Sequence, residues 1–362
     1  MADSIKIKTY KLKAGMRIAR IVENQFGAIL LTPGMILDDN TINKLQRMGI
    51  TDVYIFNETD KEVEENQLKF THQYIDSIDN FKEVMSDAKR QNNINFSSLK
   101  KIADNSLHMD TNRDIVSMLS IVRSVDEYTF SHSINVGILA MMFGRWAGLQ
   151  EKEVKQLLYA GMLHDIGKAK IPDKILNKRG PLTAQEYNIM KTHTVHGYQL
   201  TKSCMFITES VRQAVLLHHE RNDGTGYPFA YPKEKIPFMA RVMAIVDTYD
   251  AMTSDRVYRD QRPPFEVFAL FEEDLQSYDL LLTNIFMNRM AQFYLGEIVE
   301  LDNGLKGEIV FINPNQISKP IVKVGAEYID LAESELNINK VEIKKPASLN
   351  EEDEANQENV SG

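Results

Sequence analysis

Seven histidine and aspartate residues give this chain the means to bind metal ions. These residues are His132, His164, Asp165, His193, His218, His219 and Asp247. Imidazoles and carboxylates without thiolates suit iron, manganese and similar divalent metals. Two such ions a few ångströms apart form a site that promotes attack on a phosphodiester. The residue types therefore predict two-metal hydrolytic chemistry, provided that the fold brings the seven side chains together.

The combination of residues carries this prediction, because a single histidine in a helical core is more often a packed residue than a ligand. Asp247 lies in a strongly apolar segment, and a buried carboxylate needs a cationic partner such as a metal. His164 and Asp165 are adjacent at a predicted helix end, where their side chains project about 100° apart. Each can bind a different metal, or Asp165 can bridge both. His218 and His219 repeat this geometry, whereas we expect His196 beside the site or at the surface.

Length and composition are those of a globular protein with two or three domains. The chain has 362 residues, of which 43% are hydrophobic and 26% charged. No apolar segment reaches the roughly 18 residues of a membrane span, no signal peptide is visible, and one cysteine excludes a disulfide framework. We therefore expect a cytoplasmic protein. The net charge of −9 argues against binding to a nucleic acid polymer, but bound metals would still attract a small anionic substrate.

The segments that must position the ligands are predicted to be helical throughout residues 116–292. An almost wholly apolar stretch indicates a buried helix, and amphipathic stretches lead into His164 and into the histidine pair. A further helix surrounds Asp247 with apolar residues. These helices are expected over residues 134–146, 151–163, 211–217 and 240–252.

The flanking segments predict smaller domains. Residues 1–56 indicate a small α+β domain, with strands over 17–22, 28–31 and 52–56 and a helix over 39–48. Residues 57–115 contain no glycine or proline and predict a helical connector, broken at residues 92–95, that also suggests a homodimer contact.

The C-terminal part of the chain changes to a period of two. Residues 293–345 predict a small β domain with strands over 296–301, 307–312 and 321–324 and a hairpin turn at Asp302-Asn303-Gly304. Residues 346–362 form an acidic tail that we expect to be disordered.

The motifs resemble the HD-GYP branch of the HD superfamily of metal-dependent phosphohydrolases. His164-Asp165 matches the HD pair, and residues 218–228 match the pattern HHExxDGxGYP at every fixed position. The similarity continues through Asp247 and residues 250–256, and it spans roughly residues 126–294. It implies a mainly α fold, in which an HD-type catalytic domain at 116–292 is flanked by the small α+β and β domains.

This resemblance implies a phosphodiesterase that hydrolyses cyclic di-GMP to pGpG, and it leaves open whether GMP is a further product. The seven residues would bind two divalent metal ions, iron or manganese, and Asp165 would bridge them. Some members hold a third metal through a glutamate one helical turn before the first histidine. Here Tyr128 occupies that position and Glu127 stands one residue away, so two metals are expected.

A hydroxide bridging the two metals is the expected nucleophile. Lys168, three residues after Asp165, would neutralise charge that develops on the phosphate oxygens, although a solvated surface lysine is the alternative interpretation. The proton for the leaving 3′ oxygen would come from Asp165 or from a metal-bound water, and the sequence leaves both sources open.

A glycine-rich loop and two arginines are the candidates for substrate binding. Glycine lets the backbone approach a phosphate or base, and guanidinium groups suit guanine edges and phosphates. An ordinary turn and ion pairs with Asp250 or Asp255 are the alternative interpretations. The candidates are Gly226, Tyr227, Pro228, Arg256 and Arg259.

Two other functions compete with hydrolysis of cyclic di-GMP. One is a receptor or scaffold that binds cyclic di-GMP with negligible turnover, and the other is an HD hydrolase of a different nucleotide. The resemblance also implies a diguanylate cyclase (GGDEF) partner that contacts the loop at residues 226–228.

Overall fold

The computed structural model describes residues 4–24, 29–31, 35, 37–56, 60–107, 128–254, 261–274 and 276–342. The acidic tail at 346–362 therefore lies outside the described residues. The chain divides into two compact units. In the described ranges, one unit holds residues 4–72 and 290–342, and the other, called the helical unit below, holds residues 73–107 and 128–289. All seven candidate ligands belong to the helical unit. Within the described residues, no helix combines the length and apolarity needed to cross a bilayer.

The N-terminal segment forms two small antiparallel ribbons and one helix. Strand β1 (Ser4–Lys8) pairs with β4 (Asp52–Phe56), and β2 (Val22–Glu23) pairs with β3 (Ile29–Leu31). Helix α1 (Asp39–Arg47) begins at Asp38, whose carboxylate accepts from the Thr41 amide at 2.6 Å. The expected strand over 17–22 is wrong for most of its length, because this segment meets β4 through a single bridge at Ile18.

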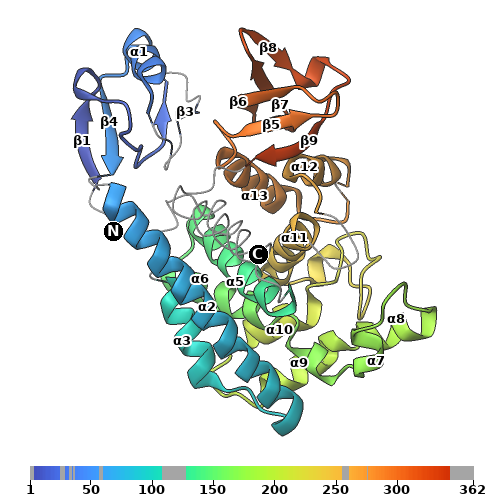
Figure 1. Cartoon of the computed structure of the whole chain (residues 1–362). Coiled ribbons are helices and arrows are strands. Elements are labelled where there is room, and N and C mark those ends of the chain that lie inside the picture. Colours follow the sequence, from blue (N-terminus) through green and yellow to red (C-terminus); the bar gives the residue numbers. More distant parts are fainter. Residues whose placement is uncertain are drawn as a thin grey trace, which may run out of the picture. The chain divides into compact units, whose positions relative to one another are not determined.

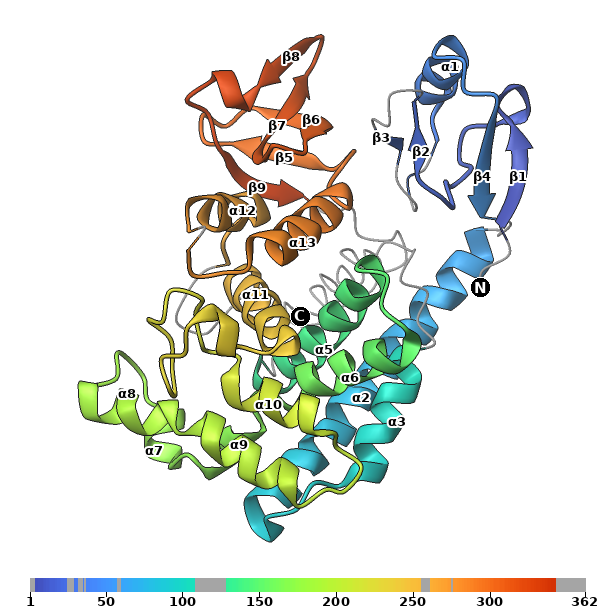
Figure 2. The same cartoon turned by 180° about the vertical axis from the view of Figure 1, so that it is seen from behind.

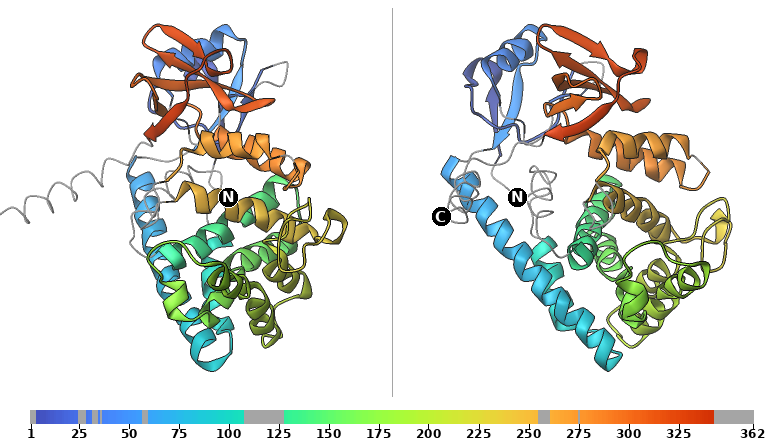
Figure 3. Two further views of the ribbon diagram at one scale, coloured as in Figure 1. Left: turned by 90° about the vertical axis from the view of Figure 1, so that its right-hand side faces the viewer. Right: turned by 45° about the vertical axis from the view of Figure 1, so that its right-hand side comes forward.

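Two helices follow in sequence, α2 (Asp60–Gln91) and α3 (Phe96–Leu107), and both are visible in blue and cyan in Figure 3. The predicted break is confirmed at Asn92, which adopts a left-handed conformation with φ 54°. Tyr74 of α2 is fully buried, and its hydroxyl donates to the side-chain oxygen of Asn135 at 2.7 Å. This bond ties α2 to the helix that carries His132.

The helices that follow residue 127 can be traced one after another in Figures 1 and 2. Their bounds are α5 (Tyr128–Trp146), α6 (Glu151–Leu163), α7 (Asp173–Leu176), α8 (Ala184–Lys191), α9 (His193–Lys202), α10 (Glu209–Leu217), α11 (Phe238–Thr253), α12 (Pro264–Glu273) and α13 (Leu280–Gln292), with 3₁₀ turns η2 (Ile166–Lys170) and η3 (Lys233–Lys235). Helix α5 packs against α6 and α11, and α10 packs against α6, α9 and α11. The mainly α fold is confirmed, because the predicted helices all form.

The C-terminal strands form one antiparallel sheet in the order β8-β7-β6-β5-β9, labelled in Figure 1. These strands are β5 (Ile298–Leu301), β6 (Lys306–Asn313), β7 (Gln316–Val324), β8 (Glu327–Asp330) and β9 (Ile338–Glu342). The predicted hairpin turn is present, with the Gly304 amide donating to the Leu301 carbonyl at 2.9 Å and Gly304 at φ 82°. The two strands missing from the sequence prediction, β8 and β9, are the edges of the sheet.

Candidate metal centre

A close crossing of α5 and α6 brings the first two histidines together. A Cβ atom on Gly161 would lie 2.5 Å from the Gly137 Cα, so the two backbones approach as nearly as glycine allows. His132 lies inside α5, and His164 is the residue that ends α6. Their rings are 5.1 Å apart, edge to face.

The other ligand candidates lie at helix ends and in one helix interior. A Cβ on Gly167 would lie 1.9 Å from the His193 carbonyl oxygen, so η2 is pressed against the start of α9. His218 ends α10, and the next residue is His219. Asp247 lies within α11 among fully buried apolar neighbours. Five helices or their ends, those of α5, α6, α9, α10 and α11, thus converge on one point.

The converging atoms fall into two groups with Asp165 between them. In the first group, the Asp247 Oδ1 lies 3.2 Å from His132 Nε2 and 3.7 Å from His164 Nε2. The second group contains His193, His218 and His219, whose ligand atoms lie within 4.8 Å of one another. Metal–ligand bonds of about 2.0–2.2 Å place neighbouring ligand atoms on the order of 3 Å apart. Both groups therefore have the size of a metal's ligand shell.

Asp165 presents one oxygen to each group. Its Oδ2 lies 3.2 Å from His164 Nε2, and its Oδ1 lies 3.3 Å from His193 Nε2. Only 4% of its surface is exposed. A carboxylate in this position has the geometry of a bridge between two cations.

Backbone carbonyls fix the orientation of three of the imidazoles. The Nδ1 atoms of His164, His193 and His218 lie 2.7, 2.8 and 2.9 Å from the carbonyl oxygens of the residues three positions earlier. A carbonyl oxygen only accepts, so each Nδ1 carries the proton and each Nε2 directs a lone pair inward. Outer hydrogen bonds of this kind hold metal-binding histidines in place.

Several inward-facing atoms lack a partner within the described protein. His164 Nε2 and Asp165 Oδ1 are buried and accept no hydrogen bond from any described residue. The Nε2 atoms of His193 and His218 face each other at 3.4 Å. Because the proton of each ring is on Nδ1, the two Nε2 atoms direct lone pairs toward each other. Buried polar atoms are normally satisfied, and a cation would satisfy these converging acceptors together. The residues present therefore fit a pair of divalent ions.

The protonation states of His193, His218, His219 and Asp165 agree with this fit. Burial lowers the pKa of His193, lowers that of His218 further with help from His219, and brings the pKa of His219 to about 3. Burial alone would raise the pKa of Asp165, but Lys168 and His164 hold it well below its usual value. Neutral imidazoles and ionised carboxylates are the forms that bind metals.

His132 is held by a second carboxylate that the sequence interpretation assigned no such role. Asp250 is fully buried, and its Oδ2 lies 2.7 Å from His132 Nδ1. Burial disfavours the charged ring, but Asp247 and Asp250 raise the pKa of His132 to about 9. The signal was present in the sequence: Asp250 follows Asp247 by three residues on one apolar helix, so both face the same side.

Lys168 lies at the edge of this centre. Its Nζ is 2.5 Å from Asp165 Oδ2, and about a quarter of its side chain is exposed. The 3₁₀ turn η2 continues the chain after Asp165 and so keeps the two side chains on one face.

The glycine-rich loop folds back onto the histidine pair. Glu220 is 1% exposed, and its carboxylate accepts from the amides of Phe229 and Tyr231 at 2.7 and 2.9 Å. A Cβ on Gly226 would lie within 2.4–2.5 Å of backbone atoms of residues 219–221, so only glycine fits there. The ring of Tyr227 consequently packs against that of His219 at a centroid distance of 4.6 Å.

With this geometry in view, the comparison with protein families is decisive. A model described as "HD domain" matches residues 100–281, half of the chain. The chain belongs to the HD domain family. The family assignment implied by the His164-Asp165 motif is thereby confirmed, and the matched segment contains all seven candidate ligands.

Curated relatives of this HD protein include named phosphodiesterases. A cyclic di-GMP phosphodiesterase of Pseudomonas aeruginosa (PA4108) is 36% identical over 210 residues, covering 58% of this chain and 51% of the relative. A cyclic di-GMP phosphodiesterase of Thermotoga maritima is 39% identical over 160 residues, 44% of this chain and 43% of the relative. The 3′3′-cGAMP-specific phosphodiesterase 2 of Vibrio cholerae is 34% identical over 153 residues, 42% of this chain and 29% of the relative.

The chain spans about half the length of the first of these relatives and less of the other two. Among solved structures, Bd1817 of Bdellovibrio bacteriovorus, titled an HDG"Y"P protein, aligns with a TM-score of 0.49 and 17% identity, over 80% of this chain and 99% of its own.

The remaining residues named from the sequence are not all described by the structure. Arg256, Arg259 and Glu127 fall outside the described residues. His196 is half-buried and is not among the clustered ligand atoms of the described part.

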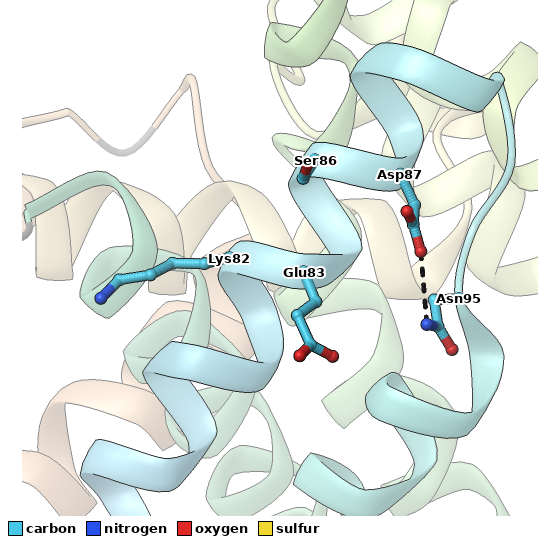
Figure 4. Close-up of a pocket in the computed structure, with 5 residues that line it drawn as sticks. All are labelled: Lys82, Glu83, Ser86, Asp87 and Asn95. Carbon is cyan, nitrogen blue, oxygen red and sulfur yellow. Dashed lines mark hydrogen bonds between the residues drawn. The ribbon is translucent and has the colours of Figure 1, made fainter.

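A hollow of about 430 Å³ lies on other elements of the same unit (Figure 4). It is lined by Lys82, Glu83, Ser86, Asp87 and Asn95, where α2 turns into α3. The Asn95 amide donates to Asp87 there at 3.3 Å. Two carboxylates and one lysine give this hollow no evident preference for an anion, so it does not compete with the metal centre as a substrate site.

Proposed function

We propose that this chain is a metal-dependent phosphodiesterase that hydrolyses cyclic di-GMP to pGpG and then to GMP. The observation that carries the proposal is Asp165, which presents its two oxygens to two separate groups of imidazoles. Bridged metal pairs are suited to in-line displacement at phosphorus. The names of the relatives from Pseudomonas and Thermotoga support cyclic di-GMP as the substrate.

One ion would be held by His132, His164 and Asp247, the other by His193, His218 and His219, and both by Asp165. When bound, the ions would supply Lewis acidity and lower the pKa of a water molecule between them. Iron and manganese are our first candidates, because imidazole and carboxylate ligands without sulfur suit them.

The remaining side chains have roles that follow from their positions. Lys168, beside Asp165, would donate a hydrogen bond to a non-bridging phosphate oxygen and stabilise the charge of the transition state. Tyr227, held on His219 by the folded loop, would form one wall of the substrate site together with Gly226 and Pro228. Arg256 and Arg259 are proposed to contact guanine edges or phosphates.

The proposal extends to the setting of the enzyme. It includes a cytoplasmic location, a diguanylate cyclase partner at the loop 226–228 and a homodimer through residues 57–115. Half-exposed Phe229, directly after that loop, supports a protein contact there.

A second candidate substrate is 3′3′-cGAMP. Two relatives from Vibrio cholerae, 34% and 30% identical, are named 3′3′-cGAMP-specific phosphodiesterases. The two cyclic dinucleotides differ only in one purine, so the metal centre would treat their phosphates alike.

The test compares the initial rates of cleavage of both nucleotides by protein loaded anaerobically with Fe(II) or Mn(II). We expect faster cleavage of cyclic di-GMP, with pGpG appearing before GMP. Faster cleavage of 3′3′-cGAMP would identify that nucleotide as the preferred substrate. Tight binding of either nucleotide without cleavage would favour the receptor function. The Lys168→Met variant should retain its metal and lose about 100-fold or more in kcat.

A further inference from the structure

A lysine lies between two tyrosine rings beside the metal centre. Lys191 Nζ is 5.2 Å from the ring centroid of Tyr187 and 5.9 Å from that of Tyr227. Tyr187 and Lys191 are four residues apart on α8 and therefore share a face. Tyr227 comes from the loop after α10 and packs against His219. Two elements thus supply one cluster of Tyr187, Lys191 and Tyr227 at the metal ligands.

The lysine of this cluster differs from its neighbours in lacking an acidic partner. Lys178 on the preceding turn pairs with Glu186, and Lys168 pairs with Asp165. In the part of the chain that the structure describes, the Lys191 ammonium forms no ion pair, and the two rings are its recorded contacts. Tyr187 is 49% exposed. An accessible ring beside an unpaired cation suits a ligand with both a planar group and a negative charge.

The proposed substrate has two phosphates and two bases, but the metal centre accounts for one phosphate. The second half of the nucleotide is then available to side chains that lie beside the metal centre. We infer that Tyr187, Lys191 and Tyr227 form a subsite for the uncleaved half of a cyclic dinucleotide. In this subsite, a tyrosine ring of the cluster stacks on the base of the uncleaved half, and Lys191 binds the phosphate of that half. This inference rests on the proposed function, because it takes its ligand from there.

The chain contains a matched control for this cluster. Tyr198 and Lys202 on α9 have the same spacing, and Lys202 Nζ lies 4.5 Å from the Tyr198 centroid. The Tyr198 hydroxyl donates to Glu209 instead of meeting a second ring. Lys202→Met therefore removes a lysine charge from an equivalent tyrosine–lysine pair and leaves the cluster of Tyr187, Lys191 and Tyr227 unchanged.

The experiment measures equilibrium binding of a hydrolysis-resistant phosphorothioate analogue of cyclic di-GMP to metal-loaded protein by calorimetry. We expect Lys191→Met and Tyr187→Ala each to weaken binding about tenfold, and Lys191→Arg and Lys202→Met to change it less than twofold. GMP, which fills only the metal centre, should bind the wild-type protein and Lys191→Met equally well. Metal content is counted for every variant, so that loss of the centre is seen separately.

Unchanged binding by Lys191→Met, or an equal loss in Lys202→Met, would overturn the subsite. A wild-type protein that fails to bind the analogue would overturn it too. A protein that binds the analogue through Lys191 but does not cleave cyclic di-GMP would refute the proposed reaction and leave the subsite standing.

Discussion

Each imidazole at the centre is defined by what its two nitrogen atoms do. In four of the five, one nitrogen is tied to the backbone or to Asp250 and the other faces its counterparts in the interior. His193 and His196 show that closeness in the sequence does not make a histidine a ligand candidate. They lie three residues apart on α9, but only the His193 ring joins the cluster of ligand atoms.

We expect His193→Ala to lose most of the bound metal and His196→Ala to keep it. The physical reason is that His193 Nε2 lies 3.3 Å from Asp165 and 3.4 Å from His218, at the meeting point of the second group. The test is the metal content of the two variants, measured by mass spectrometry after gel filtration. Equal metal content in the two variants would contradict the assignment.

Asp250 is expected to act through His132. Removal of its carboxylate in Asp250→Ala frees the ring and should weaken metal binding about 10–100-fold. Asp250→Asn still offers an oxygen to His132 Nδ1, so it should restore part of that affinity. Titration with Mn(II) at one fixed salt concentration measures the metal affinity of both variants. An alanine variant that binds metal like the wild-type protein would show that Asp250 merely packs.

Much of this detail could be predicted from the sequence, and the reason is the chemistry of the residues. Adjacent ligands such as His164-Asp165 stand out in an apolar setting, and the structure brings all seven candidates together. The roles of Asp250 and Glu220 were missed. Glu220 shows its function only when residues 229 and 231 return to it, which depends on loop closure and not on local periodicity.

At the scale of elements, the α5–α6 crossing determines how near His132 and His164 lie. Gly161→Ala should lower the free energy of unfolding by about 1–3 kcal/mol and reduce metal content, because its Cβ meets the rigid Gly137 backbone at 2.5 Å. Gly144→Ala, in the same interface, meets the flexible Leu157 side chain at 2.9 Å and should be nearly neutral. Urea unfolding of both variants tests this, and equal destabilisation would refute it.

Asp279 joins three elements and gives a prediction about pH. It accepts from Arg241 of α11 at 2.5 Å and from the Leu282 amide at 3.2 Å, and it pairs with Lys233 of η3 at 3.2 Å. Burial alone would raise the pKa of Asp279, but these contacts hold it below its usual value. Its ionised form therefore stabilises the fold above about pH 3.9, and this contribution disappears as the pH falls through the lower folded value.

The Asp279→Asn variant should consequently be about 1–3 kcal/mol less stable than the wild-type protein at pH 6. The difference should shrink as the pH falls below about 4 and the wild-type carboxylate takes up its proton. Chemical unfolding across this pH range measures it. A difference that is constant with pH would show that the ion pairs contribute nothing.

The elements themselves divide into those that the sequence predicts well and those that it does not. Helices such as α6 have an apolar face that repeats every three or four residues, and the structure places them where expected. The edge strands β1, β8 and β9 were missed because lysine, glutamate or asparagine occupy many of their positions. Such charged edges protect a sheet from pairing with other chains, and they also hide its alternation.

At the scale of the whole molecule, the ligands come from helices far apart in sequence but all within the helical unit. The chemistry should therefore depend on the folding of that one unit. The two groups of ligands share Asp165, so the two ions should bind together and a chain with half its metal should be inactive.

The most direct test counts metal ions and follows cyclic di-GMP in the same anaerobic sample. Our account predicts about two iron or manganese ions per chain, appearance of pGpG by chromatography, and loss of both in Asp165→Asn. Turnover that persists in metal-free protein or in Asp165→Asn would contradict the account, and so would a fully loaded protein that leaves cyclic di-GMP intact.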